Sequence, residues 1–174
     1  MKRLIALLAV LCMALSFAAC SAQQTAEPEE TSPDMGNPGD PEAYYFTYKG
    51  TEIRLNADME VILNALGEPK NYKESASCAF EGIDKTYSYG SFVIETYPKG
   101  EKDYVYRFWF LDDLVKTAEG IKLGDTKEVV EAVYGADAYN GRNAFVLEKK
   151  NYKMTIVLNK DGVVDSIQYD IRIG

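Results

Sequence analysis

The sequence predicts an α+β domain made of two tandem repeats, each a helix followed by an antiparallel meander. The two helices would lie on one face of a mostly antiparallel sheet. Three observations lead to this prediction: an internal duplication, helix start and stop signals in each copy, and alternating apolar runs after each copy. We expect the domain to span residues 44–174, with repeat one at about 44–113 and repeat two at about 117–174.

The duplication is a stretch that occurs twice without a gap. Residues 53–67 read IRLNADMEVILNALG, and residues 121–135 read IKLGDTKEVVEAVYG. Each copy fits a short strand, a turn, a helix with apolar residues three and four apart, and a closing Gly. The duplication therefore predicts a repeated structural unit rather than a chemical site.

In the first repeat, alternating residues predict strands at 44–48 and 51–55 on either side of a turn. Asn56 would cap the helix that ends at Gly67. Residues 71–84 show no clear period, so a second short helix and a loop both remain possible.

A hairpin with strong turn chemistry follows. Gly90-Ser91 is typical of a type II′ turn, and this turn would pair Tyr87 with Ile94 on the buried face. The next strand, 104–111, would add three more side chains to that face: Tyr106, Phe108 and Phe110.

The second repeat has clearer signals. Asp125 and Glu128 resemble a capping box, and an apolar stripe would follow along the helix at Val129, Val130 and Val133. Three alternating strands are then predicted, at 145–149, 152–159 and 163–172. Asp161-Gly162 predicts a hairpin turn between the last two. Its register pairs Leu158 with Asp165, Ile156 with Ile167, Met154 with Tyr169, Thr155 with Gln168, and Lys153 with Asp170.

The amino-terminal end predicts export. Two basic residues precede a 16-residue apolar run at 4–19, which is shorter than the roughly 20 residues of a membrane-spanning helix. We therefore read residues 1–19 as a signal peptide. The end of the run, Phe17-Ala18-Ala19-Cys20, resembles the lipobox of bacterial lipoproteins, in which Cys20 would be lipidated. The alternative is an ordinary secretory cleavage with Cys20 incidental.

Residues 20–43 predict a disordered tether. The stretch holds four of the six prolines, many acids and no basic residue, so it has too few apolar side chains to offset the entropy of ordering. The expected location is the extracytoplasmic face of the cell membrane, held by the lipid anchor alone.

Catalytic and metal chemistry is not predicted. The chain has no His, the commonest general base and transition-metal ligand. Cys78 would be the one thiol left after cleavage and lipidation, and we expect it to be buried or inert. Asp112-Asp113 fits a strand-end turn better than an acid/base pair, because neighbours on a strand point to opposite faces. No cofactor or metal is expected, and the net charge of −8 argues against nucleic acid as a partner.

The face of the sheet away from the core differs between the repeats. The second repeat would present polar side chains there: Lys153, Thr155, Asn159, Ser166, Gln168 and Asp170. The first would present Val93, Glu95, Tyr97, Val105, Arg107 and Trp109. An exposed Trp and Tyr beside an Arg is typical of protein recognition. We therefore name five of these residues as a candidate binding face: Val93, Glu95, Tyr97, Arg107 and Trp109. The alternatives are that Trp109 faces the core or that the tether covers this face.

The pattern Ile-x-Leu-Gly-Asp-Thr-x-x-x-Val-x-x-x-Tyr-Gly at 121–135, repeated in looser form at 53–67, resembles the β-lactamase-inhibitor-protein-like family. Small lipoproteins of the outer-membrane barrel assembly machinery carry a similar single motif. The resemblance implies a binding module without catalysis, whose open sheet face and loops dock a partner. One difference is that the secreted inhibitors staple their repeats with disulfides, whereas Cys78 is alone.

The sequence thus predicts an extracytoplasmic lipoprotein that binds another envelope or secreted protein without catalysis, and we expect a monomer. Two alternatives remain open. One is a sensor that binds a small molecule or glycan, and the other is an envelope hydrolase that relies on carboxylates alone.

Overall fold

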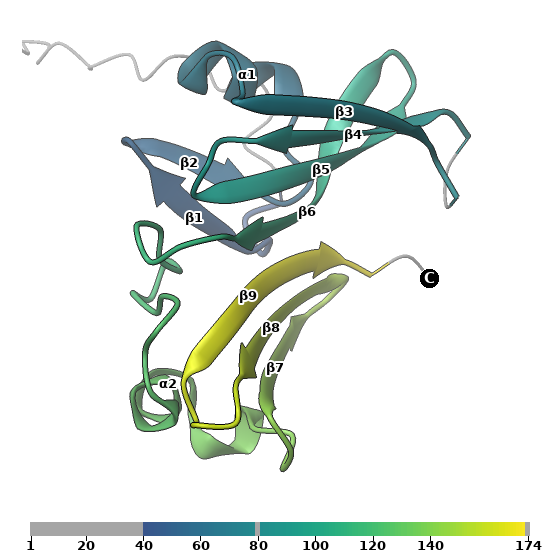
Figure 1. Cartoon of the computed structure of the whole chain (residues 1–174). Helices are drawn as coiled ribbons and strands as arrows, with labels where there is room; N and C mark the ends of the chain where they lie inside the picture. Colours follow the sequence, from purple (N-terminus) through teal and green to yellow (C-terminus); the bar gives the residue numbers. More distant parts are fainter. Residues whose placement is uncertain (1–39, 79–80, 173–174) are drawn as a thin grey trace, which may run out of the picture. The chain divides into compact units, whose positions relative to one another are not determined.

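The structure is a computed structural model that describes residues 40–78 and 81–172 (Figure 1). The predicted signal peptide, the lipidation site Cys20 and most of the predicted tether lie outside the described residues. The described elements, in chain order, are β1 (Tyr45–Tyr48), β2 (Thr51–Arg54), α1 (Met59–Leu66), β3 (Asn71–Ala76), β4 (Ile83–Ser88), β5 (Phe92–Lys99), β6 (Lys102–Phe110), α2 (Lys127–Tyr134), η1 (Ala136–Ala138), β7 (Ala144–Lys149), β8 (Tyr152–Leu158) and β9 (Val164–Ile171).

Most of the strands belong to one antiparallel sheet of seven, in the order β3-β4-β5-β6-β9-β8-β7 (Figure 1). The hairpin β1–β2 forms a separate two-stranded sheet. Each run of consecutive strands is a meander. The two meanders meet where β6 pairs with β9, because β6 ends the first and β9 ends the second.

The predicted fold class, two tandem helix-plus-meander repeats of the α+β type, is wrong. The described chain is mostly sheet, with two α-helices of eight residues each. Residues 71–76, which we left as helix or loop, form β3, and residues 45–54 form their own small sheet. The physical reason is that β3 is exposed on both faces, so its sequence carries no apolar period from which a strand could be predicted.

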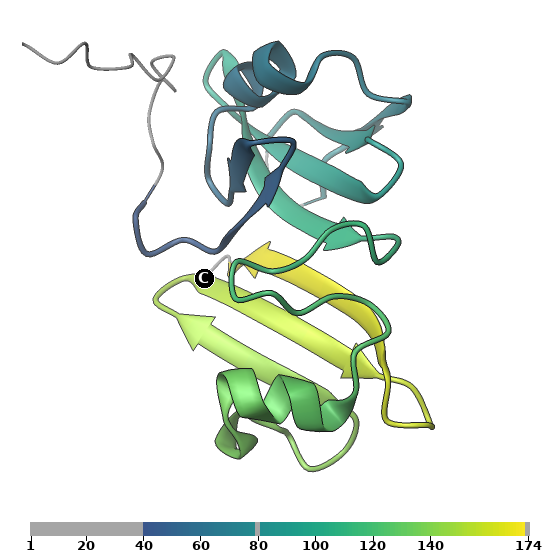
Figure 2. The ribbon, with the colours of Figure 1, turned by 90° about the vertical axis from the view of Figure 1, so that its left-hand side faces the viewer.

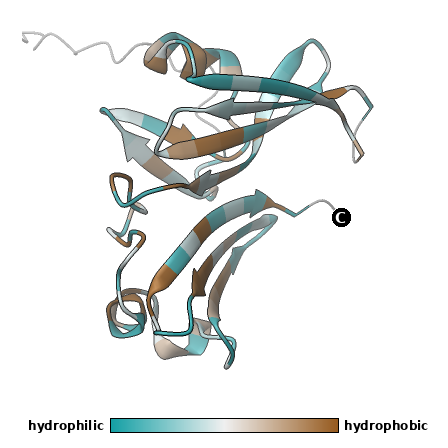
Figure 3. Cartoon of the chain, viewed as in Figure 1, coloured by the Kyte–Doolittle hydropathy of each residue, from teal (hydrophilic) through white to brown (hydrophobic). Residues whose placement is uncertain are grey.

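The register of the predicted hairpins is largely confirmed. Tyr87 pairs with Ile94, Ile156 with Ile167, Met154 with Tyr169, Thr155 with Gln168, and Lys153 with Asp170. Leu158 pairs with Val164 rather than Asp165, because the register shifts beside the turn. Brown and teal segments alternate along β9 in Figure 3, as expected for a strand with one buried face.

Both helices start later than predicted. The N-cap of α1 is Asp58, whose carboxylate accepts a hydrogen bond from the backbone N–H of Glu60, while Asn56 lies in a turn with a positive φ. The N-cap of α2 is Thr126 rather than Asp125. The capping residue thus lies within two positions of the predicted one in each case.

The apolar stripe of α2 differs from the prediction. Val130 is fully buried, but Val129 and Val133 remain 46% and 42% exposed. Tyr134 takes part in the packing instead. Its hydroxyl lies 4.0 Å from the sulfur of Met154 on β8, on the part of the sheet that α2 covers (Figure 2).

A β-bulge in β6 changes which side chains face the core. Glu95 is opposite Arg107, but the next residue, Thr96, is opposite Val105, so Tyr106 is an extra residue in β6. Val105 therefore turns inward and is fully buried, whereas we predicted it on the outer face and Tyr106 in the core. A single inserted residue reverses the alternation from that point back to the start of the strand.

The core forms one cluster that includes residues of both meanders, and the hairpin β1–β2 contributes its centre. The ring of Phe46 on β1 lies 4.9–5.0 Å from the rings of Phe92, Phe108 and Phe110. The ring of Tyr44, just before β1, lies 5.8 Å from that of Tyr169 on β9. The hairpin therefore packs against the first meander, and the residue just before it packs against the second.

The segment before β1 is held by Arg54. Its guanidinium donates hydrogen bonds to the backbone carbonyls of Asp40, Pro41 and Ala43. Residues 40–43, which we assigned to the end of the tether, thus form a turn fixed to the fold.

We predict that Phe46→Ala lowers the free energy of unfolding by about 3–5 kcal/mol, because it removes a fully buried ring in contact with three others. Thr47→Ala is the matched control, since Thr47 is the next residue and is exposed on the opposite face. Chemical denaturation measures both. Equal losses in the two variants would contradict the central position of Phe46.

Candidate functional site

The outer face of the seven-stranded sheet, opposite the core, carries a row of charges that crosses five strands. Consecutive strand pairing places Glu95, Arg107, Asp170, Lys153 and Glu148 side by side, on β5, β6, β9, β8 and β7. The sign of the charge alternates at every step, so no two like charges are directly opposite. We call this set the charge row.

Arg107 is the centre of the charge row. Its Nε lies 2.5 Å from Oδ1 of Asp170, a guanidinium nitrogen lies 3.2 Å from Oε2 of Glu95, and the group stacks over the ring of Tyr106 at 5.1 Å. Burial alone lowers the pKa of Arg107, but the hydrogen bond to Asp170 and the two negative charges raise it more, so the net shift is upward. The guanidinium is thus engaged within the chain and ties the two meanders together.

Asp170 is the most enclosed member of the charge row, with a side chain only 7% exposed. The side-chain amide of Gln168 donates to both of its carboxylate oxygens at 3.0 Å. A buried carboxylate needs such partners, because burial without them is strongly unfavourable.

A neutral row runs beside the charge row. It contains Val93, Trp109, Gln168, Thr155 and Val146, again directly opposite one another in neighbouring strands. Val93 is 6% exposed, whereas Trp109 is half-buried and keeps part of its ring accessible. Trp109 alternates with the buried Phe108 and Phe110, so it does not face the core.

The structure therefore brings four of the five candidate binding residues together at the middle of the outer face. The fifth, Tyr97, lies beyond the bulge, opposite Tyr104. The Tyr97 hydroxyl donates a hydrogen bond to the side chain of Asn56 at 2.8 Å, and burial raises the pKa of Tyr97. Tyr97 thus fastens the loop before α1 to the sheet.

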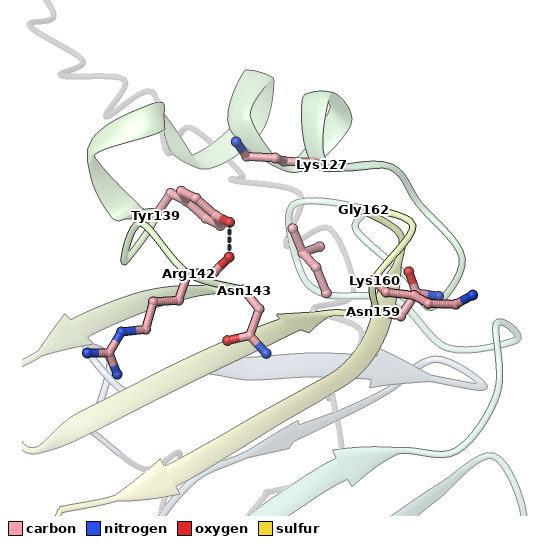
Figure 4. A pocket seen from close by; sticks show the side chains of 8 residues that line it. Lys127, Tyr139, Arg142, Asn143, Asn159, Lys160 and Gly162 are labelled. Atoms are coloured by element: carbon pink, nitrogen blue, oxygen red, sulfur yellow. Dashed lines mark hydrogen bonds between the residues drawn. The ribbon is translucent and has the colours of Figure 1, made fainter.

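A polar pocket of about 400 Å³ lies at the start of α2 (Figure 4). In Figure 4, Lys127, Tyr139 and Asn143 surround its middle, while Arg142 and Lys160 extend to either side. Leu158 also lines the pocket. The ammonium of Lys127 lies 4.1 Å from the centre of the Tyr139 ring and 3.2 Å from Glu131. No acidic side chain lines this pocket, although the chain as a whole is acidic.

An apolar groove of about 450 Å³ lies between the end of α1 and the start of β3. The sequence did not predict it, because β3 was not recognised. Tyr72 on β3 is 50% exposed, and its ring lies 5.1 Å from that of Tyr87 on β4. Burial and a hydrogen bond to Glu74 raise the pKa of Tyr72. The groove is lined by Leu63, Asn64, Gly67, Glu68, Pro69, Tyr72 and Tyr87.

Two other residues singled out from the sequence carry no site. Cys78 is exposed rather than buried, and it forms no disulfide. Asp112 accepts a hydrogen bond from the backbone N–H of Leu114, as expected of a turn at the end of a strand. Within residues 40–78 and 81–172, no group of three or more acids and cysteines is arranged to hold a metal ion. In the same part of the chain, no helix is long and apolar enough to cross a membrane.

Comparisons with known proteins add little. No family model matches the chain, and no curated protein matches it significantly. Among solved structures, the chain is similar to an extracellular protein containing an SCP domain from Bacillus anthracis str. Ames, with 12% sequence identity and a TM-score of 0.41. The match covers 67% of this chain and 44% of that one, so the chain spans less than half its length. A likeness of this size supports no conclusion about function.

We predict that Asp170→Asn destabilises the protein by about 1–3 kcal/mol, because it weakens a charge-assisted hydrogen bond in an enclosed position. Glu95→Gln is the matched control on the other side of Arg107, where the side chain is 30% exposed. Its cost should stay below about 1 kcal/mol. Urea denaturation at neutral pH compares the two variants. A larger loss of unfolding free energy for Glu95→Gln would contradict the assignment of Arg107–Asp170 as the stabilising ion pair between the meanders.

Proposed function

We propose that the chain is a lipoprotein, anchored through Cys20 to the extracytoplasmic face of the membrane, that binds another protein without catalysis. The signal sequence, the Phe17-Ala18-Ala19-Cys20 motif and the acidic tether support the location. The resemblance of residues 121–135 to the β-lactamase-inhibitor-protein-like motif supports a binding role. The absence of His from the sequence removes the commonest general base.

The observation that carries the proposal is the middle of the outer face, around Trp109. Partly accessible Trp side chains contribute strongly to protein interfaces, because their large ring is rigid and amphipathic. In the neighbouring charge row, Arg107 is ion-paired with both Glu95 and Asp170, so this part of the row would present a preorganised polar rim to a partner. A broad face of this kind suits a protein better than a small molecule, which needs an enclosing pocket.

We predict that Trp109→Ala removes specific partners from a pull-down of envelope extract while costing only about 1 kcal/mol of stability. The stability is preserved because Trp109 is half-buried, whereas a core aromatic residue would cost several kcal/mol. Thr155→Ala, in the same neutral row two strands away, is the control and should keep the partners. Identical partners for wild type and Trp109→Ala, or a loss of several kcal/mol in Trp109→Ala, would refute this role.

We also predict that the exported protein incorporates a labelled fatty acid, and that Cys20→Ala abolishes the label. Mass spectrometry of the mature amino terminus gives an independent readout. The Cys78→Ala variant serves as the control and should label normally. A secreted wild-type protein without lipid would contradict the anchor and favour ordinary cleavage.

A second candidate function is binding of an anionic small molecule or glycan, and the pocket of Figure 4 favours it. Lys127, Arg142 and Lys160 supply positive charge there, and the ring of Tyr139 offers an apolar wall. Saturable binding of glucose 6-phosphate, but not glucose, that is lost in Arg142→Gln would support this alternative.

A further inference from the structure

The outer edge of β3 is open. All six residues of β3 are exposed, and the strand is the last one at its end of the seven-stranded sheet (Figure 1). Among the described residues, none pairs with β3 on the side away from β4. Such an edge offers unpaired backbone donors and acceptors, which natural proteins usually protect.

The edge at the other end of the sheet is different. There, Tyr139 forms a bridge with Phe145 of β7, and the backbone N–H of Asn140 donates to the carbonyl of Ala144. The first two residues of β7 are also buried. One end of the sheet is thus partly covered by its own chain, whereas β3 is not covered by any described segment.

The pairing with β4 determines which backbone groups of β3 point outward. The backbone N–H of Ser77 donates to the carbonyl of Gly82 at 3.1 Å, so these two residues form a hydrogen-bonded pair. The register from Ala76 back to Asn71 has no bulge, and hydrogen-bonded pairs alternate along it. The backbone N–H and C=O groups of Tyr72, Glu74 and Ala76 therefore point away from β4.

The side chains of these same residues lie on the core side of the sheet. Tyr72 is directly opposite Tyr87, which is 5% exposed and belongs to the core. The apolar groove between α1 and β3 opens on this side, and Tyr72 forms part of its wall. An apolar side chain of an added strand, opposite Tyr72, would reach the groove.

A second copy of this chain is a poor occupant of the edge. The β3 strands of two copies could pair antiparallel in two registers. Each register uses five of the six residues and pairs outward backbone groups of one copy with outward backbone groups of the other. One places Lys73 opposite Lys73 of the other copy, and the second places Glu74 opposite Glu74. Like charges directly opposite one another destabilise a sheet. The edge is thus suited to a different polypeptide with complementary charges.

We propose that β3 accepts an extended segment of a partner protein, which adds antiparallel to the sheet beyond β3. Its backbone bonds to Tyr72, Glu74 and Ala76. A basic residue lies opposite Glu74, an acidic residue lies opposite Lys73, and an apolar side chain opposite Tyr72 contacts the groove. The backbone bonds supply affinity, and the side-chain positions supply selectivity. This docking edge is separate from the outer face around Trp109.

The test uses the full chain and a synthetic probe peptide, acetyl-Thr-Val-Lys-Glu-Phe-Thr-amide, written to place its residues opposite positions 76 to 71 in that order. Amide hydrogen exchange is followed by NMR. In the free protein the amides of Tyr72, Glu74 and Ala76 exchange fast, while those of Lys73 and Ser75 are protected by β4. With saturating probe, the three outward amides slow at least tenfold. Unchanged exchange of these amides overturns the proposal.

Two variants at one position provide the matched comparison. Glu74→Pro removes one outward N–H without removing a bond to β4, whereas Glu74→Ala loses the same side chain and keeps the N–H. The probe slows exchange in Glu74→Ala, with affinity within about fivefold of wild type, but not in Glu74→Pro. Equal binding by both variants refutes the backbone pairing. Loss of protection at Lys73 and Ser75 in Glu74→Pro refutes the assigned direction of the backbone groups.

Further controls test the charge selectivity of the edge, a second copy as its occupant, and its independence from the outer face around Trp109. A probe with Lys and Glu exchanged binds at least several-fold more weakly, because it opposes like charges, and equal binding refutes the charge selectivity. Protection of the outward amides that rises with protein concentration, without probe, overturns the proposal in favour of a second copy. Trp109→Ala leaves the response to the probe unchanged. A failure of β3 to bind the probe can therefore be distinguished from a failure of the outer face to bind a partner.

Discussion

The pairing of β6 with β9 is the contact on which the rest of the sheet depends. It consists of three residue pairs, Arg107 with Asp170, Phe108 with Tyr169, and Trp109 with Gln168. On the core side, the rings of Phe108 and Tyr169 lie 4.5 Å apart, and Phe46 packs against Phe108. On the outer side, Arg107 and Asp170 form an enclosed ion pair. Two meanders become one sheet because an aromatic contact and an ion pair act on opposite faces of the same few residues.

This arrangement limits which residues are free to bind a partner. From the sequence, Arg107 and Trp109 look alike as candidate contacts, since both point to the outer face. In the structure Arg107 is bound to Asp170 and Glu95, so any contact with a partner competes with a bond that holds the sheet together. Trp109 is half-buried and, unlike Arg107, carries no charge that an ion pair of the sheet engages. Stability and recognition are therefore divided between neighbouring residues of one strand.

Sequence reasoning succeeded where turn chemistry and apolar alternation agree. The hairpins at Gly90-Ser91 and Asp161-Gly162 were predicted with most of their residue pairs, because each has a specific turn and one buried face. Sequence-based prediction failed where residues have neither a specific turn nor an apolar alternation. β3 is exposed on both faces, and the bulge at Tyr106 leaves no local signal. Beside the bulge, the loop before α1 pairs with β6 at Val105, a contact between residues far apart in the sequence. The overall fold class was wrong partly for the same reason, since β3 has no apolar period and was not counted as sheet.

The open edge illustrates what topology adds to sequence. Asn71–Ala76 contains no residue that would suggest a binding site, and its value comes from its position at the end of the strand order. The two edge strands of the sheet also differ in the connection that leads into them from the preceding helix. After α2, the chain passes through η1 and Tyr139 before it enters β7, and this passage covers the start of that edge. After α1, it passes through Pro69 directly into β3, and this shorter connection does not cover the edge. Among the described residues, the length of the connection after the helix, rather than the repeated helix itself, thus distinguishes the covered edge from the open one.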